Sequence, residues 1–338
     1  MARMTTRSPL PAAAATEALG RSEPFLSFQE ALSRAAAVDR PVLLVGERGS
    51  GKELAAARLH YHSPRWDKPF VALNCAALAP ALIESELFGH EAGAFTGALA
   101  RRAGRFEAAD SGSLFLDEVS RMPAEVQEKI LRVVEYGTFE RVGASEAMSA
   151  DVRLIAATNE DLPSLAAAGR FKPDLLDRLS FLVLTIPPLR QRGEDVLLLA
   201  EHFASRMAVE LGREEPPRLT ATARVTLLAH PWPGNVRELK NTVERALFLA
   251  DGPDIDDIPL DPFASPYRPA SYAPTPAPAR TPDPDLTTSL PDQVKTLKLT
   301  LLRQALARAR HNQHDAAKLL GLSYHALRAL YRSLKDEI

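Results

Sequence analysis

The chain has 338 residues, of which 46% are hydrophobic and 25% charged, and a formal net charge of −2. This length predicts two or three domains, and the near-neutral charge excludes a nucleic-acid-binding surface over the whole molecule. A single cysteine, Cys75, excludes disulfides within one chain. Together with the lack of any apolar run near the ~18 residues of a membrane span, it predicts a cytoplasmic protein without a membrane-spanning segment.

The first 190 residues divide into a short leader and a region of recurring apolar runs. Residues 1–24 are rich in Ala but interrupted by Pro11 and Glu17, so we expect a disordered leader and no signal peptide. In the region 25–190, five apolar runs do not alternate strictly with polar residues, which is typical of strands buried on both faces. We therefore predict an α/β domain with a mostly parallel sheet. Its strands are expected at 41–45, 70–74, 113–117, 153–158 and 181–186, with helical segments at 53–60 and 123–135.

The remaining residues divide into two helical regions and a linker. Helical periodicity over 191–260, broken at 231–234 by a Pro-Trp-Pro-Gly sequence, predicts a helical lid domain. Residues 261–291 include nine prolines and predict an extended linker. Residues 292–338 are helical again, with nine Lys and Arg against three Asp and Glu from Gln293 onward. This basic excess predicts a small all-α domain that binds nucleic acid.

A glycine-rich loop lies between the first predicted strand and the helical segment that follows it. The strand–loop–helix context indicates a phosphate-binding loop, whose backbone N–H groups hold the phosphates of ATP while Lys52 reaches the outer ones. Glu53 stands where most such loops have Ser or Thr for Mg²⁺. A purely structural turn is the alternative. The predicted nucleotide-binding residues here are Gly46, Glu47, Gly49, Ser50, Gly51, Lys52 and Glu53.

An apolar strand ends in two acids, Asp117 and Glu118. Asp117 is predicted to hold Mg²⁺, and Glu118 to polarise the water that attacks ATP. Alone, this pattern also fits a solvated strand end. Its distance along the chain from Lys52 suits a P-loop ATPase and favours the catalytic interpretation.

Sixteen residues, 87–102, lie between these two motifs and are not needed for hydrolysis. Gly93 and Gly97 permit tight turns, and Phe95 and Thr96 between them have no reason to be exposed unless they contact a partner. A flexible surface loop is the alternative. The sequence Gly93-Ala94-Phe95-Thr96-Gly97-Ala98 is identical to the loop by which bacterial enhancer-binding activators contact sigma-54 RNA polymerase. The chain therefore resembles the sigma-54-dependent activator family.

This resemblance implies an AAA+ P-loop ATPase with a parallel sheet and a helical lid. It also implies roles for further polar residues. Asn74 resembles the residue that restrains the catalytic Glu118, although an Asn at a strand end more often caps a turn. Thr158 and Asn159 resemble a sensor of the γ-phosphate, and Arg237, within a Trp-Pro-Gly-Asn-Val-Arg-Glu-Leu sequence, resembles the sensor arginine of the lid.

Residues 171–179 look like the family's finger segment, which reaches the ATP of a neighbouring subunit. Arg178 fits this role, while Lys172 stands where the family usually has a second arginine, and its role stays open. Sites completed in this way imply a homo-oligomeric ring, commonly a hexamer. Arg141 and Val142 resemble a second loop that moves with the polymerase-contacting loop.

Residues 313–328 have the spacing of a helix-turn-helix. Ala317 is small at the expected helix crossing, Gly321 lies in the turn, and Leu322 and Leu327 are expected to point inward. A helical hairpin with a solvated basic face is the alternative. The resemblance implies a Fis-type domain that binds enhancer DNA, through Ser323 as the helix cap and Tyr324, His325, Arg328 and Arg332 on the outer face.

About 25 residues precede the ATPase, so we expect no sensory domain there. This favours the branch of the family that activates the phage-shock (membrane stress) operon and is controlled by a separate protein inhibitor. Trp66 is a candidate docking point for such an inhibitor, or packs locally. The interpretation is an ATP-driven activator that opens sigma-54 promoters. The alternatives are an activator of another regulon, an AAA+ unfoldase, and a DNA-binding regulator with a degenerate ATPase.

Overall fold

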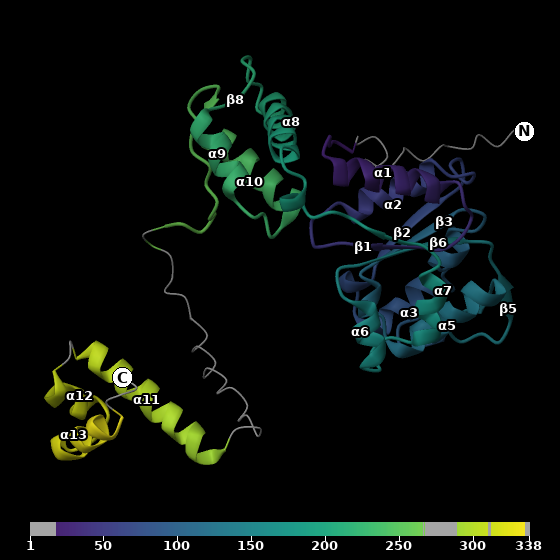
Figure 1. Cartoon of the computed structure of the whole chain (residues 1–338). Coiled ribbons are helices and arrows are strands. Elements are labelled where there is room, and N and C mark those ends of the chain that lie inside the picture. Colours follow the sequence, from purple (N-terminus) through teal and green to yellow (C-terminus); the bar gives the residue numbers. More distant parts are fainter. Residues whose placement is uncertain (1–17, 266, 268–288, 310–311, 335–338) are drawn as a thin grey trace, which may run out of the picture. The chain divides into compact units, whose positions relative to one another are not determined.

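The computed structural model describes residues 18–265, 267, 289–309 and 312–334. The chain forms two compact units, Met1–Pro262 and Phe263–Ile338 (Figure 1). Most of the expected leader and most of the expected linker lie outside the described residues. Among the described residues, no helix is long and apolar enough to cross a membrane.

The first unit is built on a five-stranded sheet of order β2-β3-β6-β1-β7, in which every pairing is parallel. The predicted parallel sheet is confirmed. Central strands β3 and β6 are almost entirely buried, because helices cover both faces, whereas the edge strands β2 and β7 are only partly buried. The strands are β1 (Val42–Val45), β2 (Phe70–Asn74), β3 (Ser113–Asp117), β6 (Arg153–Thr158) and β7 (Val183–Thr185).

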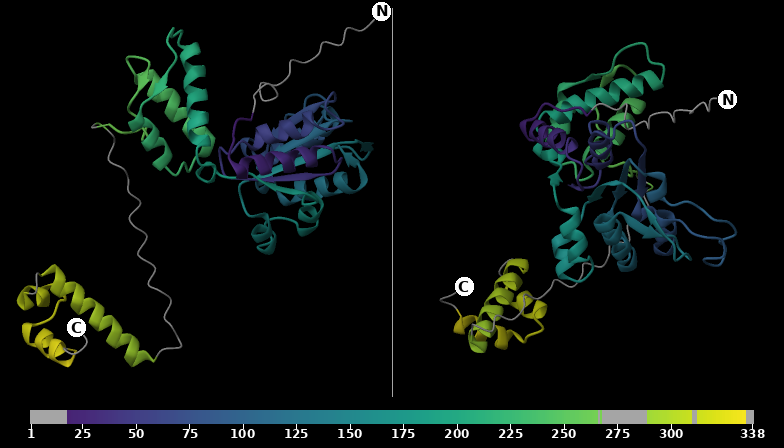
Figure 2. Two further views of the ribbon diagram at one scale, coloured as in Figure 1. Left: turned by 45° about the horizontal axis from the view of Figure 1, so that its top comes forward. Right: turned by 90° about the vertical axis from the view of Figure 1, so that its right-hand side faces the viewer.

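Helices lie on both faces of this sheet (Figures 1 and 2). α1 (Glu23–Ala36) and α2 (Lys52–Tyr61) cover one face. The other face carries α3 (Pro80–Phe88), α4 (Arg105–Ala108), α5 (Ala124–Tyr136), α6 (Leu162–Ala167) and α7 (Pro173–Leu179). The short helical turns η2 (Cys75–Ala77) and η3 (Val119–Arg121) follow β2 and β3.

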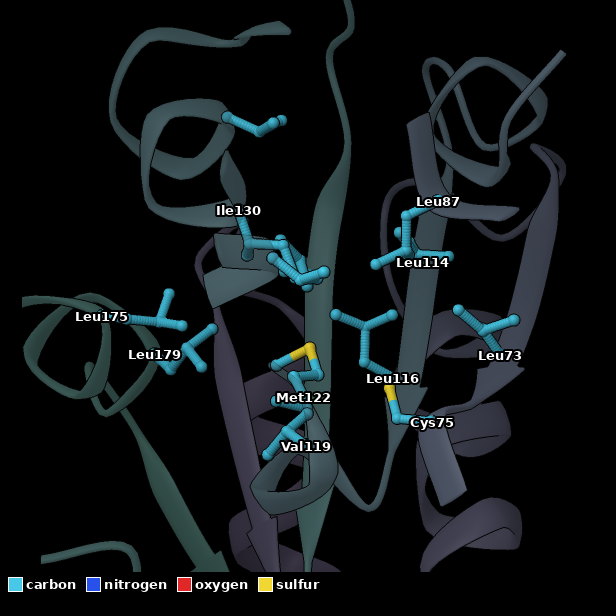
Figure 3. Close-up of a cluster of buried hydrophobic side chains, with 14 of the residues drawn as sticks. Leu73, Cys75, Leu87, Leu114, Leu116, Val119, Met122, Ile130, Leu175 and Leu179 are labelled. Atoms are coloured by element: carbon cyan, nitrogen blue, oxygen red, sulfur yellow. The ribbon is translucent and has the colours of Figure 1, made fainter. Parts of the chain in front are cut away.

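The larger core lies between the sheet and α3, α5 and α7 (Figure 3). Leu114 and Leu116 of β3 point to this face, two residues apart as the strand period requires. They pack with Leu87 of α3, Ile130 of α5 and Leu179 of α7. Each fully buried side chain of this kind stabilises the fold by about 1.5–3 kcal/mol. This core fixes the carboxyl ends of the strands, where the predicted site residues lie.

A two-stranded hairpin follows α5, formed by β4 (Thr138–Glu140) and β5 (Ala147–Ser149). Gly137 ends α5 with φ 67°, a left-handed conformation that glycine adopts without strain. The hairpin tip carries Arg141 and Val142, so the predicted second insertion is a hairpin loop between α5 and β6.

The lid packs around Trp232, which is fully buried and donates a hydrogen bond from Nε1 to the carbonyl of Leu227 (2.8 Å). Trp232 and Asn235 both have positive φ, 51° and 52°, at the predicted helix break. The lid elements are η4 (Leu189–Gln191), α8 (Asp195–Glu210), β8 (Arg218–Leu219), α9 (Ala221–Ala229), α10 (Asn235–Leu249) and β9 (Asp254–Ile255).

The second unit contains α11 (Leu290–Arg308), α12 (Gln313–Leu319) and α13 (Tyr324–Ser333) around a small core. α11 begins inside the segment predicted as linker, because Pro291 is tolerated in the first turn of a helix. Ala317 and Leu327 are buried, as predicted. Leu322 is 38% exposed, so the prediction that it points inward is wrong. It follows the turn glycine Gly321 and precedes the cap Ser323, outside both helices.

His60 is a fully buried titratable group at the amino end of the sheet. Its ring stacks on Phe70, with centroids 5.1 Å apart, and its Nδ1 lies 2.9 Å from the Ser113 hydroxyl. Burial disfavours the charged ring and lowers the pKa of His60 from 6.5 to about 4. The unfolded chain therefore takes up this proton first, and folding requires the neutral ring.

We expect the stability of the first unit to depend on pH through His60. The contribution is fully present above about pH 6.5 and is lost as the pH falls toward 4, by up to about 3 kcal/mol. Urea unfolding followed by circular dichroism at pH 7 and pH 5 measures this loss, and His60→Asn is expected to lose less stability between the two values. Carboxylates such as Glu47, with a pKa lowered to about 2, matter only below about pH 4.5. Equal pH dependence of the two proteins contradicts this prediction.

Candidate functional site

The glycine-rich loop connects β1 to α2 and approaches the lid closely. Gly49 has φ 73°, and a Cβ on it would lie 2.2 Å from the carbonyl oxygen of Gly234. Only glycine therefore fits between the loop and the lid at this position. The backbone N–H of Arg237, the predicted lid sensor, donates to the Gly49 carbonyl (3.3 Å), so the backbone of this residue lies next to the loop.

Lys52 is held inside the loop by the loop's own backbone. Its Nζ donates to the carbonyl of Gly46 (3.0 Å) and lies 4.0 Å from Oε1 of Glu118. Burial lowers the pKa of Lys52, and the nearby Glu118 carboxylate opposes that shift. The loop therefore places the ammonium and the carboxylate of the two predicted motifs side by side.

Two buried polar atoms, one in the glycine-rich loop and one directly after β6, have no partner within the described part of the chain. They are the Oγ of Ser50 in the loop and the Oδ1 of Asn159, which follows β6. Buried polar groups are normally hydrogen-bonded, so these atoms are free for a ligand. The neighbouring Thr158 is different, because its hydroxyl already accepts from the N–H of Glu160 (3.0 Å). Of the predicted sensor pair, Asn159 is the residue with an available oxygen.

The carboxyl end of β3 brings together Asp117, Glu118 and Asn74. The Nδ2 of Asn74 donates to Oδ2 of Asp117 (3.2 Å), and its Oδ1 accepts from the N–H of Ala76 (2.9 Å). Asn74 thus caps η2 and contacts the acidic pair through Asp117, not through Glu118. Glu118 has φ 54°, which is uncommon for a residue with a side chain and occurs preferentially at functional sites.

These groups fit Mg²⁺ bound together with a nucleotide. Mg²⁺ typically takes one or two carboxylates plus substrate phosphates; β3 ends at Asp117 with Glu118 directly after it, and the Ser50 hydroxyl of the loop has no partner within the described residues. Glu53 lies on the first turn of α2 with its side chain exposed.

Glu47 is the main link between the loop and the lid, a role that sequence reasoning did not assign. It receives two hydrogen bonds from Arg190, at 2.7 and 2.8 Å, and one from Nδ2 of Asn235 (3.0 Å). The Arg190 guanidinium, followed by Asn235, lowers the pKa of Glu47 to about 2. Buried Asn235 also accepts from the N–H of Leu189 (2.8 Å). The position of Asn235 in the Trp-Pro-Gly-Asn sequence was the signal from which its contact with the loop could have been predicted.

The predicted finger segment forms α7, and both of its candidate cations pair with α5. Arg178 donates to Oε1 of Glu135 through Nε (3.0 Å) and Nη2 (2.7 Å). Lys172 donates to Glu128 (2.9 Å). Glu128 and Glu135 are seven residues apart, two helical turns, and so lie on the same side of α5. Both cations remain partly exposed.

The loop of residues 93–98, called the contact loop below, rises from a narrow base. At this base His90 exchanges two backbone hydrogen bonds with Arg102, and the N–H of Glu91 donates to the carbonyl of Val142 (3.1 Å). Arg141 is buried and bridges Glu91 (2.9 Å) and Glu107 (2.6 Å). The hairpin loop after β4, which is the predicted second loop and carries Arg141 and Val142, is therefore bonded to the base of the contact loop.

Within the contact loop, Phe95 is 40% exposed and Thr96 is exposed, whereas Ala98 is buried. Gly93 and Gly97 have φ 83° and 104°. Sequence reasoning missed Leu99, which is 95% exposed just beyond the loop.

The structure places the predicted helix cap and the predicted outer-face residues at and on α13, which follows α12. The Ser323 hydroxyl accepts from the N–H of Ala326 (3.2 Å) and caps α13. Gly321 has φ 65° in the turn. The predicted DNA-contacting side chains are all exposed, namely Tyr324, His325, Arg328 and Arg332.

Comparison with known proteins matches three family models to successive parts of the chain. A Sigma-54 interaction domain matches residues 18–185, an AAA+ ATPase lid domain residues 190–271, and a Bacterial regulatory protein, Fis family, residues 300–332. Among solved structures, NtrX from Brucella abortus in complex with ATP is 33% identical with a TM-score of 0.66, covering 95% of this chain and 70% of that chain.

Curated relatives differ in how much of them the chain spans. The Psp operon transcriptional activator of Escherichia coli (strain K12) is 51% identical over 93% of this chain and 96% of its own length. The nitrogen fixation protein VnfA of Azotobacter vinelandii is 42% identical over 91% of this chain and 57% of its own length. The anaerobic nitric oxide reductase transcription regulator NorR of Citrobacter koseri is 41% identical over 94% and 63%. The chain thus spans under two thirds of VnfA and NorR.

Proposed function

Because the chain belongs to the family of sigma-54-dependent activators, which combine an ATP-binding AAA+ domain with a Fis-type helix-turn-helix, we propose that it hydrolyses ATP to remodel sigma-54 RNA polymerase. In this proposal the protein binds enhancer DNA upstream of the promoter, and its remodelling of the polymerase allows the promoter DNA to open. The observation that carries this proposal is a series of successive elements, closed by one ion pair, that connects the predicted catalytic end of β3 to the base of the contact loop. η3 begins directly after Glu118, α5 and the β4–β5 hairpin follow, and Arg141 of that hairpin holds Glu91 at the base of the loop.

In this proposal the chain's own residues bind, orient and transmit. The loop backbone and Lys52 hold the triphosphate, and Glu118 orients and deprotonates the attacking water. Asp117 would hold Mg²⁺, which would supply positive charge beside the phosphates when bound. Arg178 acts on the ATP of the neighbouring subunit, so the active form is a ring, which we propose to be a hexamer. Lys172 is a weaker candidate for the same role, because it lacks a planar fork.

Thr96→Ala tests the proposal directly. The variant is expected to keep ATP hydrolysis, because the contact loop is separate from the loop that contains Lys52, but to lose sigma-54 binding and promoter opening. Binding is measured by gel shift with sigma-54 in the presence of ADP and a metal fluoride that mimics the transferred phosphate. Thr222→Ala, on the lid helix α9, is the matched control. Loss of hydrolysis together with binding indicates instead that the contact loop is structural.

Arg328→Ala tests the enhancer-binding part of the proposal. Loss of one base or phosphate contact is expected to weaken binding to the upstream region of the chain's own gene by about 5- to 150-fold. If Arg328 contacts a phosphate, the salt dependence also becomes shallower, by about one unit of log–log slope. Fluorescence anisotropy at two salt concentrations measures both. Lys298→Ala, an exposed lysine on α11, serves as the control. Unchanged affinity removes Arg328 from the interface.

We also propose the phage-shock regulon, on the basis of the 51% identity to the Psp operon activator over nearly its whole length. Identities of 41–42% to NorR and VnfA keep another regulon as the alternative. A separate inhibitor of the phage-shock type is part of this proposal, and Trp66, with 60% of its side chain exposed, is its docking candidate. The DNA and polymerase partners support a cytoplasmic location.

A further inference from the structure

Phe95, the aromatic residue of the contact loop, rests against the ring of His90. The two ring centroids are 5.0 Å apart at an interplanar angle of 64°, the edge-to-face arrangement that aromatic pairs favour. Phe95 is 40% exposed, whereas nearby Leu99 is 95% exposed. In this conformation the apolar tip of the loop is partly covered.

The loop backbone alone does not hold Phe95 in this position. Its turn is closed by bonds within the loop, from the N–H of Gly93 to the carbonyl of Ala98 (2.8 Å) and from the N–H of Ala98 to the carbonyl of Phe95 (3.0 Å). At Gly93 and Gly97, a Cβ would meet no described atom within 4 Å beyond the adjacent residues. The backbone N–H of Ala94 bonds the loop to its base at Glu91 (3.2 Å), whereas the ring of Phe95 is placed by its side-chain contact with His90.

His90, in contrast, is fixed to the body of the domain. Its side chain is 8% exposed, and its Nδ1 lies 2.7 Å from the Ser85 hydroxyl of α3. Its backbone pairs with Arg102 and forms a bridge to Val142 of the second loop. The bond to Ser85 fixes the orientation of the His90 ring. The position of the His90 backbone depends on the second loop, the hairpin loop that carries Arg141 and Val142.

We infer that His90 is a positioning residue that docks Phe95 against the ATPase body in the resting protein. Movement of the second loop displaces the His90 backbone, separates the two rings and exposes Phe95. The docking of Phe95 by His90 concerns the contact loop alone. The release of Phe95 rests on the proposed function, because it makes Phe95 available to sigma-54 only when the two rings separate.

Chymotrypsin cleavage after Phe95 in the full-length, nucleotide-free protein tests docking without sigma-54. Loss of an edge-to-face pair is expected to make cleavage about 2- to 10-fold faster in His90→Gln, which can still bond Ser85 but has no ring. His90→Phe keeps a ring and is expected to return the rate toward that of the wild type. A purely structural role predicts the reverse, because phenylalanine leaves the Ser85 hydroxyl unpaired. Cleavage after Tyr136, which is 73% exposed, is the internal control.

Two results overturn the inference. One is an unchanged cleavage rate after Phe95 in His90→Gln, and the other is equal acceleration after Tyr136, which indicates general loosening. If His90→Gln does not fold, Ser85→Ala replaces it, with a smaller acceleration expected because the ring loses its anchor. Sigma-54 binding without nucleotide, expected to rise in His90→Gln, is measured separately. If no variant binds sigma-54 even with the metal fluoride, the proposed function fails while the cleavage result still decides the docking.

Discussion

Glu118→Gln is expected to hydrolyse ATP about 100- to 10,000-fold more slowly than the unaltered protein while still binding it. The amide has the shape of the carboxylate but cannot accept a proton from water. Glu118 is well placed for this role, because it directly follows β3 and its carboxylate lies 4.0 Å from Nζ of Lys52. Binding survives because the glycine-rich loop and Lys52 remain intact.

The measurement separates chemistry from binding. Single-turnover hydrolysis gives the rate of the chemical step, and titration with a fluorescent ATP analogue gives the affinity. Glu125→Gln is the matched control, since Glu125 is an exposed acid in the first turn of α5 and its replacement removes the same charge. Full hydrolysis by Glu118→Gln rules out this carboxylate as the base. Loss of binding instead means that its contact with Lys52 holds the loop together.

The sheet could be predicted from the sequence because burial leaves a clear pattern. β3 and β6 are buried on both faces, so their runs are continuously apolar, and the predicted ranges coincide with the observed strands. Edge strand β7, exposed at both ends, is shorter than the predicted 181–186. The glycine-rich loop between β1 and α2 was equally predictable, because strand, glycines and lysine are consecutive in the chain.

Contacts between distant segments could not be predicted in the same way. Glu47 was expected to face phosphates as part of the loop, but its bonds go to Arg190 and Asn235, more than 140 residues away. The pairing of Arg178 with Glu135 likewise joins two helices whose relative position depends on the core between them. Leu322 was expected to point inward from the helix-turn-helix spacing, but it lies between the turn glycine Gly321 and the cap Ser323, where neither helix fixes its direction. Periodicity describes one element at a time and does not identify such partners.

Arg178→Ala is expected to reduce ATP hydrolysis about 1,000-fold or more, because an arginine that stabilises transition-state charge on phosphate contributes 10³ to 10⁵ to the rate. We expect Arg178 to act on a neighbouring subunit because of its pairing and its exposure. Within the chain, Arg178 donates hydrogen bonds from Nε and Nη2 to Glu135. The Arg178 side chain is nevertheless 58% exposed. The exposed part of the guanidinium can then reach outward.

Mixing two inactive variants distinguishes action on a neighbour from action within one chain. Lys52→Ala lacks a working phosphate site but keeps Arg178, and Arg178→Ala has the opposite defect. In a randomly mixed ring, about a quarter of the interfaces join an intact site to an intact arginine, so hydrolysis is expected to return to about that fraction of the unaltered rate. An arginine acting within its own chain gives a mixture as inactive as its components, because no protomer carries both groups. Native mass spectrometry of the mixture is the reference for subunit exchange, because rings that contain both variants differ in mass from rings of either variant alone.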